Sequence, residues 1–381
     1  MANILDYLQW RGDLLLTERP FNSVDNLILS VLAYTDLKGI VPPEGGILLA
    51  DAAARYAAEG RDQSHQACDP KEALMAAAGS ARFRNARLSA YADRTDTEAE
   101  LQFSAVTFTL DDGSLYVAYR GTDNSIVGWR EDFNMGWRET PGQLLAVEYL
   151  NRCGAGDAPL RIGGHSKGGN FAAFAAACCD ASVQQRITRV YNNDGPGFLR
   201  GFLASDGYRR ILGRLELLLP ENSLIGILLR SGTEGRTVKS SASGFQQHNP
   251  YTWQVLGTDF ETVEKRSGTS TFVDETVDQW LDRLSDTERQ HFVAAVFDSL
   301  EASGVSTLTE LNANRKVTYN AVLKAASELE PDTQKDFFRA LKSLAATGTD
   351  LLWAEAKKAL DRWSAERRSQ SEDKKNETEN T

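Results

Sequence analysis

The segment Gly164-His165-Ser166-Lys167-Gly168 constrains the fold of this chain more than any other. It fits G-x-S-x-G, with an apolar approach ahead of it and an alanine-rich run after it. A serine between a buried strand and a helix must sit on a tight turn, so the residues two positions to either side need to be glycine. The pattern predicts a nucleophile elbow that presents Ser166 at a helix N-terminus; the alternative is a glycine-rich turn with an incidental serine.

Strand and helix patterns alternate on both sides of this turn. Apolar positions recur at helical spacing in residues 24–34, and the β-rich runs 103–110 and 115–119 flank an Asp-Gly turn typical of a hairpin. Further helices are expected at 48–58, 70–78 and 143–152, and further strands at 186–191, 215–219 and near 237–240. The order predicts an α/β fold with a mostly parallel sheet, whose sites lie at the carboxyl ends of the strands.

From about residue 263 the patterns are helical only, and a capping box at Ser285-Asp286-Thr287-Glu288 opens one of these helices. Beyond Glu366 the chain is almost wholly polar and charged, which predicts disorder. We therefore expect three parts: an α/β domain over residues 1–260, a helical C-terminal region over 261–365 and a disordered tail over 366–381. The apolar positions of the C-terminal helices must bury a face, by packing within the protein or by forming a lid or a partner interface.

Composition excludes several functions. The formal net charge of -11 argues against nucleic acid as the main partner. The four cysteines include no C-x-x-C pair and no glycine-rich phosphate loop is present, so we expect a reducing compartment, no metal site and no cofactor. There is no signal-like N-terminus and no apolar run of about 18 residues, which predicts a cytoplasmic protein without a transmembrane segment.

A serine nucleophile needs a base, usually a histidine oriented by a carboxylate, and the chain has only four histidines. His165 is expected to be a packed residue whose side chain points away from the nucleophile. His65 precedes the strands of the core, and His291 belongs to the C-terminal helices. His248 lies in a polar loop after the last core strand, where the order nucleophile, acid, histidine places the base.

The acid and the second oxyanion donor are sought at strand ends. Asp194 ends the strand that follows the elbow helix, and Glu221, which ends the next strand, is the runner-up. The backbone N–H of Lys167 is one oxyanion donor, and Thr122, at the end of the hairpin's second strand, can offer its N–H and its hydroxyl as another. The head group of Lys167 is expected to be solvated.

Two stretches resemble the oxyanion segment and the elbow of class 3 lipases: Tyr119-Arg120-Gly121-Thr122 with Trp129 and Asp132, and residues 164–170. Over roughly residues 1 to 260 the fuller resemblance is to the bacterial Mbeg-like family, a lipase-like family of unknown function, and it lies in residues 24–30, 192–197, 220–226 and 247–250. The resemblance implies an α/β-hydrolase fold with Ser166 as nucleophile, His248 as base and Thr122 and Lys167 as oxyanion donors.

The chain departs from class 3 lipases at two positions. Class 3 lipases carry their catalytic acid one strand later than Asp194, at a place where this chain has Glu221-Asn222-Ser223 and no aspartate. Pancreatic-type lipases carry the acid at the position that Asp194 occupies here. Lys167 stands where class 3 lipases have an apolar residue directly after the nucleophile, which argues against long-chain lipids as substrates.

These features predict a serine hydrolase that cleaves a small-molecule or lipid carboxylic ester through an acyl-enzyme on Ser166. The alternatives are a thioesterase or acyltransferase with the same triad, and a non-catalytic binding or scaffolding protein that uses the C-terminal helices for a protein partner.

Overall fold

The computed structural model describes residues 1–61, 68–123, 130–132, 134–135, 138–221, 223 and 232–263, with scattered positions between 287 and 334. The chain divides into two compact units, of which the first comprises Met1–Arg266 and Gly304–Asn314 and the second Ser267–Ser303 and Arg315–Thr381. The predicted catalytic and oxyanion residues Ser166, Asp194, His248, Thr122 and Lys167 all belong to the first unit. The helices predicted after residue 263 and the predicted tail lie outside the described residues, apart from the scattered positions.

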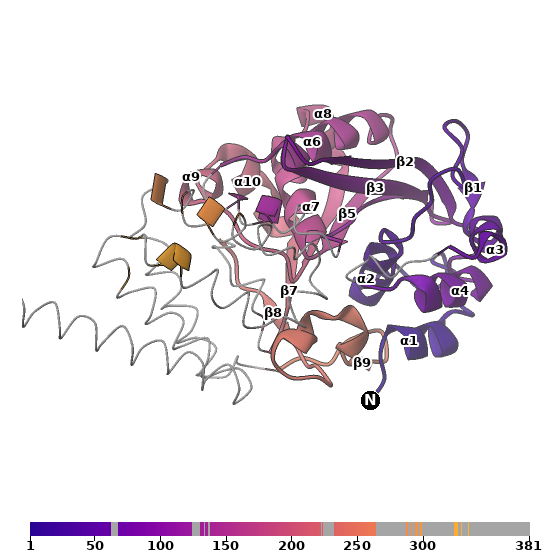
Figure 1. Cartoon of the computed structure of the whole chain (residues 1–381). Helices are drawn as coiled ribbons and strands as arrows, with labels where there is room; N and C mark the ends of the chain where they lie inside the picture. The colour runs from indigo at the N-terminus through magenta and orange to yellow at the C-terminus, as the bar shows by residue number, and fades with distance from the viewer. Residues whose placement is uncertain are drawn as a thin grey trace, which may run out of the picture. The chain divides into compact units, whose positions relative to one another are not determined.

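An eight-stranded sheet with its strands in sequential order forms the centre of the first unit (Figure 1). Strands β1 to β4 pair antiparallel, and β4 to β8 pair in parallel. The predicted α/β fold with a mostly parallel sheet is confirmed. The strands are β1 Ile47–Leu48, β2 Arg87–Asp96, β3 Leu101–Thr109, β4 Leu115–Tyr119, β5 Leu160–His165, β6 Ile187–Asn193, β7 Leu215–Pro220 and β8 Arg236–Val238.

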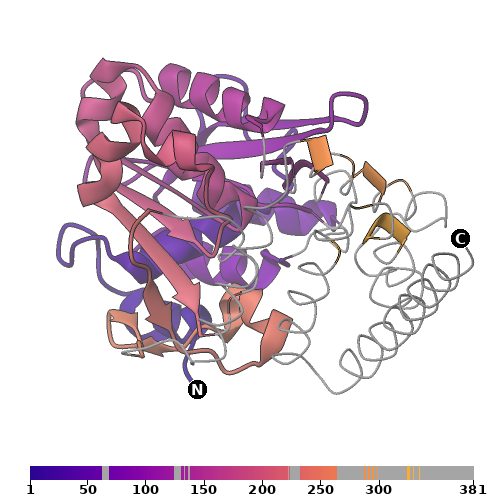
Figure 2. The same cartoon turned by 90° about the vertical axis from the view of Figure 1, so that its left-hand side faces the viewer.

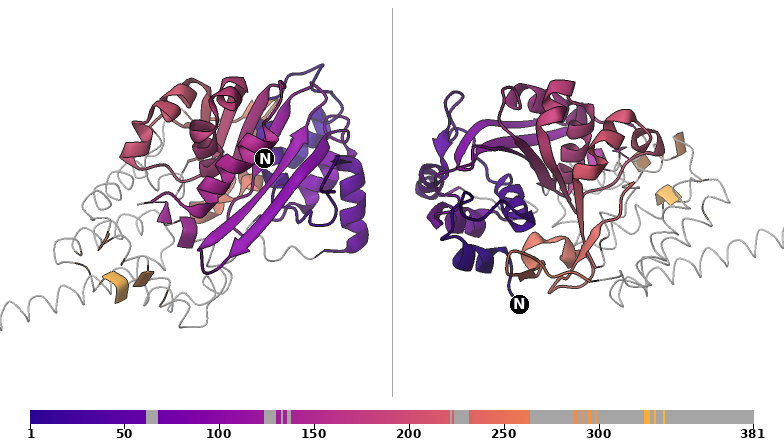
Figure 3. Two further views of the ribbon diagram at one scale, coloured as in Figure 1. Left: turned by 90° about the horizontal axis from the view of Figure 1, so that it is seen from above. Right: turned by 180° about the vertical axis from the view of Figure 1, so that it is seen from behind.

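The hairpin predicted across the Asp-Gly turn is present, because Ala105 pairs with Tyr119 and Thr109 with Leu115. The sequence did not reveal β2, which is the long partner of β3 in the left panel of Figure 3. Half of its residues are exposed and only Leu88 is buried, and its register with β3 shifts between Ser89 and Ala92, so no regular alternation marks it as a strand.

Helices cover both faces of the sheet (Figures 1 and 3). On one face lie α1 Ile4–Arg11, α2 Ser23–Leu32, α3 Leu49–Glu59 and α4 Lys71–Gly79. On the other lie α6 Pro141–Cys153, α7 Lys167–Cys178, α8 Ala181–Arg186 and α10 Asp206–Ile211. The short helix α9 spans Arg200–Leu203, and β9 Val255–Leu256 and β10 Asp259–Phe260 form a small separate sheet.

Capping boxes set where three of these helices begin. Asn3, Asn22 and Thr140 each close one, at the starts of α1, α2 and α6 respectively. The N-terminus lies beside β9, where the Val255 N–H donates to the Ala2 carbonyl at 2.9 Å (Figure 2). Strand β9, which follows the segment carrying His248, is thereby tied to the start of the chain.

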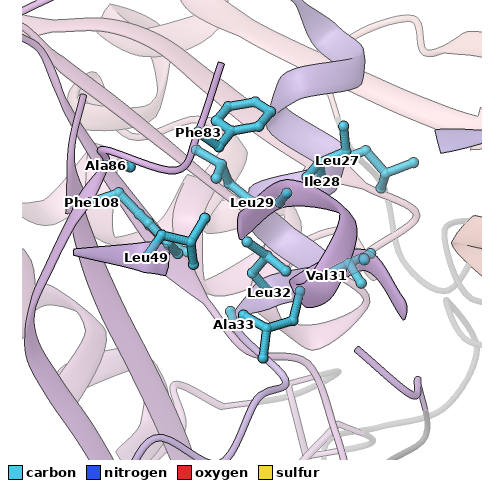
Figure 4. Packing of buried hydrophobic residues seen from close by; sticks show 14 of the residues in the cluster. Leu27, Ile28, Leu29, Val31, Leu32, Ala33, Leu49, Phe83, Ala86 and Phe108 are labelled. Carbon is cyan, nitrogen blue, oxygen red and sulfur yellow. The ribbon is translucent and has the colours of Figure 1, made fainter. Parts of the chain in front are cut away.

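Helix α2 is wholly buried and forms the centre of the core on its face of the sheet. Figure 4 shows its apolar side chains packed around Leu49, Phe83 and Phe108. The elbow helix α7 is buried from Lys167 to Ala177 on the opposite face, where its alanines allow close approach to the strands. The strand carrying the elbow is therefore held between two rigid apolar layers.

The register brings the carboxyl ends of four strands to one edge of the sheet. Tyr119 pairs with Gly164, His165 with Asn193, and Asn193 with Leu218. Residues that directly follow β4, β5, β6 and β7 therefore meet there, as parallel topology requires.

Candidate active site

Ser166 lies at the turn between β5 and α7, with φ 58° and ψ -134°, a backbone conformation that non-glycine residues rarely adopt. The turn is tight on both sides. A Cβ at Gly164 would overlap the backbone of Gly168, and a Cβ at Gly168 would overlap the carbonyl of Tyr119. The two glycines of the motif are thus required by close backbone approach. Ser166 itself is 5% exposed.

A buried amide holds this turn in place from the neighbouring strand. The Ser166 N–H donates to the Asn193 carbonyl at 2.9 Å, and the Asn193 side chain donates to the Gly164 carbonyl at 2.9 Å. Asn26 of α2 donates to the Asn193 side-chain oxygen at 2.8 Å. The strained turn is therefore fixed by hydrogen bonds from β6, and α2 holds the Asn193 side chain that makes one of them.

Asp194 and His248 meet beside the elbow. His248 Nδ1 lies 2.6 Å from Asp194 Oδ2, and the other Asp194 oxygen accepts a hydrogen bond from the Ser223 hydroxyl. Asp194 is fully buried, has φ 54°, and donates its own N–H to the Leu218 carbonyl at 2.8 Å. A carboxylate can only accept a hydrogen bond, so the His248 imidazole carries its proton on Nδ1 and its lone pair on Nε2.

The runner-up acid, Glu221, lies elsewhere. Its side chain accepts from the Ser240 N–H at 3.5 Å. Ser223, from the same stretch, instead supports Asp194. The structure thus pairs the histidine with the residue after β6, and a hydroxyl from the end of β7 completes the pairing.

His165 is buried, as predicted, but its ring lies against His248 instead of pointing away from the site, with ring centroids 4.6 Å apart. Its Nε2 is 2.8 Å from the His248 carbonyl, which can only accept, so Nε2 carries the proton. Its Nδ1 then accepts from the Tyr34 hydroxyl at 3.1 Å. Burial, followed by the nearby His248, lowers the pKa of His165 well below its usual value, so this histidine stays neutral.

The segment after β4 passes directly beside the elbow. A Cβ built at Gly121 would lie 3.0 Å from the Ser166 Cβ and 2.6 Å from the His165 carbonyl. Thr122 follows, 3% exposed, and its hydroxyl donates to Asp132 Oδ2. Burial raises the pKa of Asp132 to about 6, although the Lys167 ammonium and the Thr122 hydrogen bond act to lower it. Trp129 lies outside the described residues.

The expectation of a solvated Lys167 head group is wrong. The side chain is fully buried, and its Nζ lies 3.1 Å from Glu131 Oε2, 3.3 Å from Gln102 Oε1 and 3.7 Å from Asp132 Oδ1. The sequence placed Lys167 on the first turn of a helix, where lysines are usually exposed, and the acceptors that bury it come from distant parts of the chain. Its backbone N–H, in the first helical turn, has no acceptor within the helix.

Two further histidines were considered as the base. His291 is an exposed residue of the second unit, and His65 lies outside the described residues. Across the part of the chain that the structure describes, no group of His, Cys, Asp and Glu side chains could hold a metal ion, and no helix has the length and apolar character to cross a membrane.

Sheet and site together define an α/β protein with a strained serine at a strand-to-helix turn and, at the same sheet edge, a partly buried histidine paired with a buried aspartate. The chain belongs to the Mbeg1-like family, whose sequence model matches residues 77–298, more than half of its length. That range includes Ser166, Asp194 and His248. A search of curated proteins gave no match.

Proposed function

We propose that the protein is a serine hydrolase that cleaves a carboxylic ester through an acyl-enzyme on Ser166. The observation that carries this is the 2.6 Å contact between His248 Nδ1 and Asp194 Oδ2, at the sheet edge where the elbow presents Ser166. A buried carboxylate at Nδ1 leaves Nε2 as the ring nitrogen able to accept a proton, which a general base for serine requires.

In the first half-reaction, the Ser166 oxygen attacks the ester carbonyl carbon while His248 Nε2 takes its proton. The negative charge that develops on the carbonyl oxygen is held by the backbone N–H groups of Lys167 and Thr122. The hydroxyl of Thr122 is already donated to Asp132, so the backbone N–H is the group of Thr122 that serves. Collapse of the tetrahedral intermediate breaks the bond to the alcohol oxygen, which leaves with the proton from His248.

In the second half-reaction, a water molecule gives a proton to His248 Nε2 and attacks the acyl carbon. The ester bond to Ser166 breaks, Ser166 recovers its proton, and the carboxylic acid leaves. During both halves the Asp194 carboxylate faces the imidazolium and stabilises its positive charge. Because a thioester would follow the same path with a thiol as leaving group, the choice of acyl substrate lies in the pocket and not in these residues.

Turnover of graded esters tests the proposal. Purified wild-type protein should hydrolyse at least part of a series of p-nitrophenyl esters from acetate to palmitate, run beside matched acyl thioesters. Ser166→Ala and His248→Ala should each lose all turnover above background while keeping the wild-type melting temperature within a few degrees. Full activity in the Ser166→Ala variant would refute the assignment, and a folded wild-type protein inert toward the whole series would favour a binding role for this family member.

A further inference from the structure

A lysine ammonium buried beside the nucleophile calls for an explanation beyond local packing. Taking such a charge out of water costs several kcal/mol, and an apolar side chain of similar size is often no less stabilising. Lys167 nevertheless occupies this position with no exposed side-chain surface. Its contacts indicate what the charge does.

Glu131 is the nearest partner and is anchored by the surrounding backbone. Its Oε1 accepts from the Gly142 N–H at 2.9 Å, at the start of α6, and its Oε2 accepts from the Gln102 N–H at 3.1 Å, on β3. A Cβ at Gly142 would overlap the Glu131 carboxylate. The lysine is therefore paired with a carboxylate whose position is fixed by two elements of the fold.

From Lys167, two paths lead to the segment after β4. In the first, the ammonium lies 3.7 Å from Asp132 Oδ1, while Asp132 Oδ2 accepts the Thr122 hydroxyl. Asp132 Oδ1 is buried and makes no hydrogen bond among the described residues, so the lysine charge is what offsets its burial. In the second, the ammonium donates to Gln102 Oε1 at 3.3 Å, and the same oxygen accepts from the Asp123 N–H at 3.1 Å.

We propose that the Lys167 side chain is a positioning residue that fixes Thr122 as an oxyanion donor relative to the N-terminus of α7. The proposal rests on the proposed hydrolase function for its catalytic meaning. Lys167 then acts on both oxyanion donors. Its backbone N–H is one donor, and its side chain holds Asp132 and Gln102, which bond Thr122 and Asp123 around the other donor. The ammonium also offsets two carboxylates, Glu131 and Asp132, that would otherwise repel a negative oxygen at this place.

Replacing Lys167 alone would leave Glu131 charged and buried, which is strongly destabilising. The test variant is therefore Lys167→Met with Glu131→Gln, which removes this ion pair with side chains of similar size and leaves Asp132 with its hydrogen bond from Thr122. The matched control is Arg161→Met with Asp112→Asn, a partly buried ion pair at 3.0 Å whose arginine lies near the start of β5, the strand that carries the elbow at its other end. Circular dichroism and thermal melting establish that both double variants fold.

The first readout is backbone protection. Hydrogen exchange of the Thr122 and Asp123 amides, followed by NMR, should become at least tenfold faster in the Lys167→Met/Glu131→Gln variant and stay unchanged in the control. This readout needs no turnover, so it tests the positioning even if the protein hydrolyses no ester. Unchanged exchange in the folded test variant would overturn the proposal.

The second readout separates positioning from loss of folded protein. With kcat expressed per site titrated by a fluorophosphonate, the test variant should lose at least tenfold in kcat, while KM changes less than threefold and the control stays at the wild-type value. A test variant with wild-type kcat per titrated site would refute the catalytic part of the proposal and leave the hydrolase assignment standing. Absence of activity in the wild type would instead remove the hydrolase assignment.

Discussion

Asp194→Asn removes the negative charge that faces His248 and keeps the size and shape of the side chain. The carboxylate oxygen lies 2.6 Å from Nδ1, so the centres of opposite charge in the transition state are about 4 Å apart. At an effective dielectric constant of about 20, that attraction amounts to about 4 kcal/mol. Its loss alone lowers the rate roughly 10³-fold.

The amide also reverses the hydrogen bond. If the side-chain oxygen continues to accept from Ser223, the NH2 group faces His248 Nδ1 and donates to it, which moves the ring proton to Nε2. In that tautomer the nitrogen needed as base is already protonated. We therefore expect kcat to fall by roughly 10⁴-fold in total, the order known for the same change in other triads.

Stability should be nearly conserved, because asparagine tolerates a positive φ such as the 54° of Asp194. We expect a loss of about 1 kcal/mol, from the weaker hydrogen bond to Ser223, and a melting temperature lowered by roughly 2–4 °C. The assays are steady-state hydrolysis of the best ester and thermal melting by circular dichroism.

Glu221→Gln is the matched control, since Glu221 contacts the Ser240 N–H and lies outside the pair. It should keep kcat within twofold of the wild type. The reasoning is refuted if Asp194→Asn keeps kcat within tenfold, or if Glu221→Gln carries the loss instead.

Three further changes test the fold around the site. Gly164→Ala, whose Cβ overlaps the start of α7, should lower the free energy of unfolding by more than about 3 kcal/mol in urea titrations, whereas Gly213→Ala, with open space around it, should be nearly neutral. Burial raises the pKa of Asp132 to about 6 from 3.8, so the folded state keeps a proton that the unfolded chain has lost. Stability relative to Asp132→Asn should therefore fall as pH rises from about 4 to 7, by up to about 3 kcal/mol in urea titrations at stepped pH, and a flat difference would contradict this. Arg82→Met leaves buried Asp25, 2.5 Å away, without its charge partner and should cost about 3–5 kcal/mol in the same titrations, and replacing both residues should recover part of that loss.

Local spacing explains why much of the fold was predictable. The glycines around Ser166 and the Asp-Gly turn between β3 and β4 are short-range signals, because the backbone conformation there admits few residue types. The parallel order then follows from alternation of strands and helices. Strand β2 was missed because a strand with mixed exposure and a shift in register shows no regular period.

The residues of the candidate site that directly follow a strand were predictable from the sequence. The contacts between side chains that are distant in the sequence were not. Asp194 follows β6 directly, so topology alone places it beside the elbow. The environment of Lys167 depends on Gln102 and Glu131, which lie 65 and 36 positions away in the chain, and no local pattern links them. The contact of His165 with the His248 carbonyl spans 83 positions and escaped prediction for the same reason.

The most direct test of the central claim is the site of covalent modification by a fluorophosphonate. Intact-mass spectrometry of the wild-type protein should show one adduct, and peptide mapping should place it on Ser166. Ser166→Ala should show no adduct, and His248→Ala should show greatly slowed labelling. An adduct on another residue, or an equal adduct in Ser166→Ala, would contradict the assignment of Ser166 as the nucleophile.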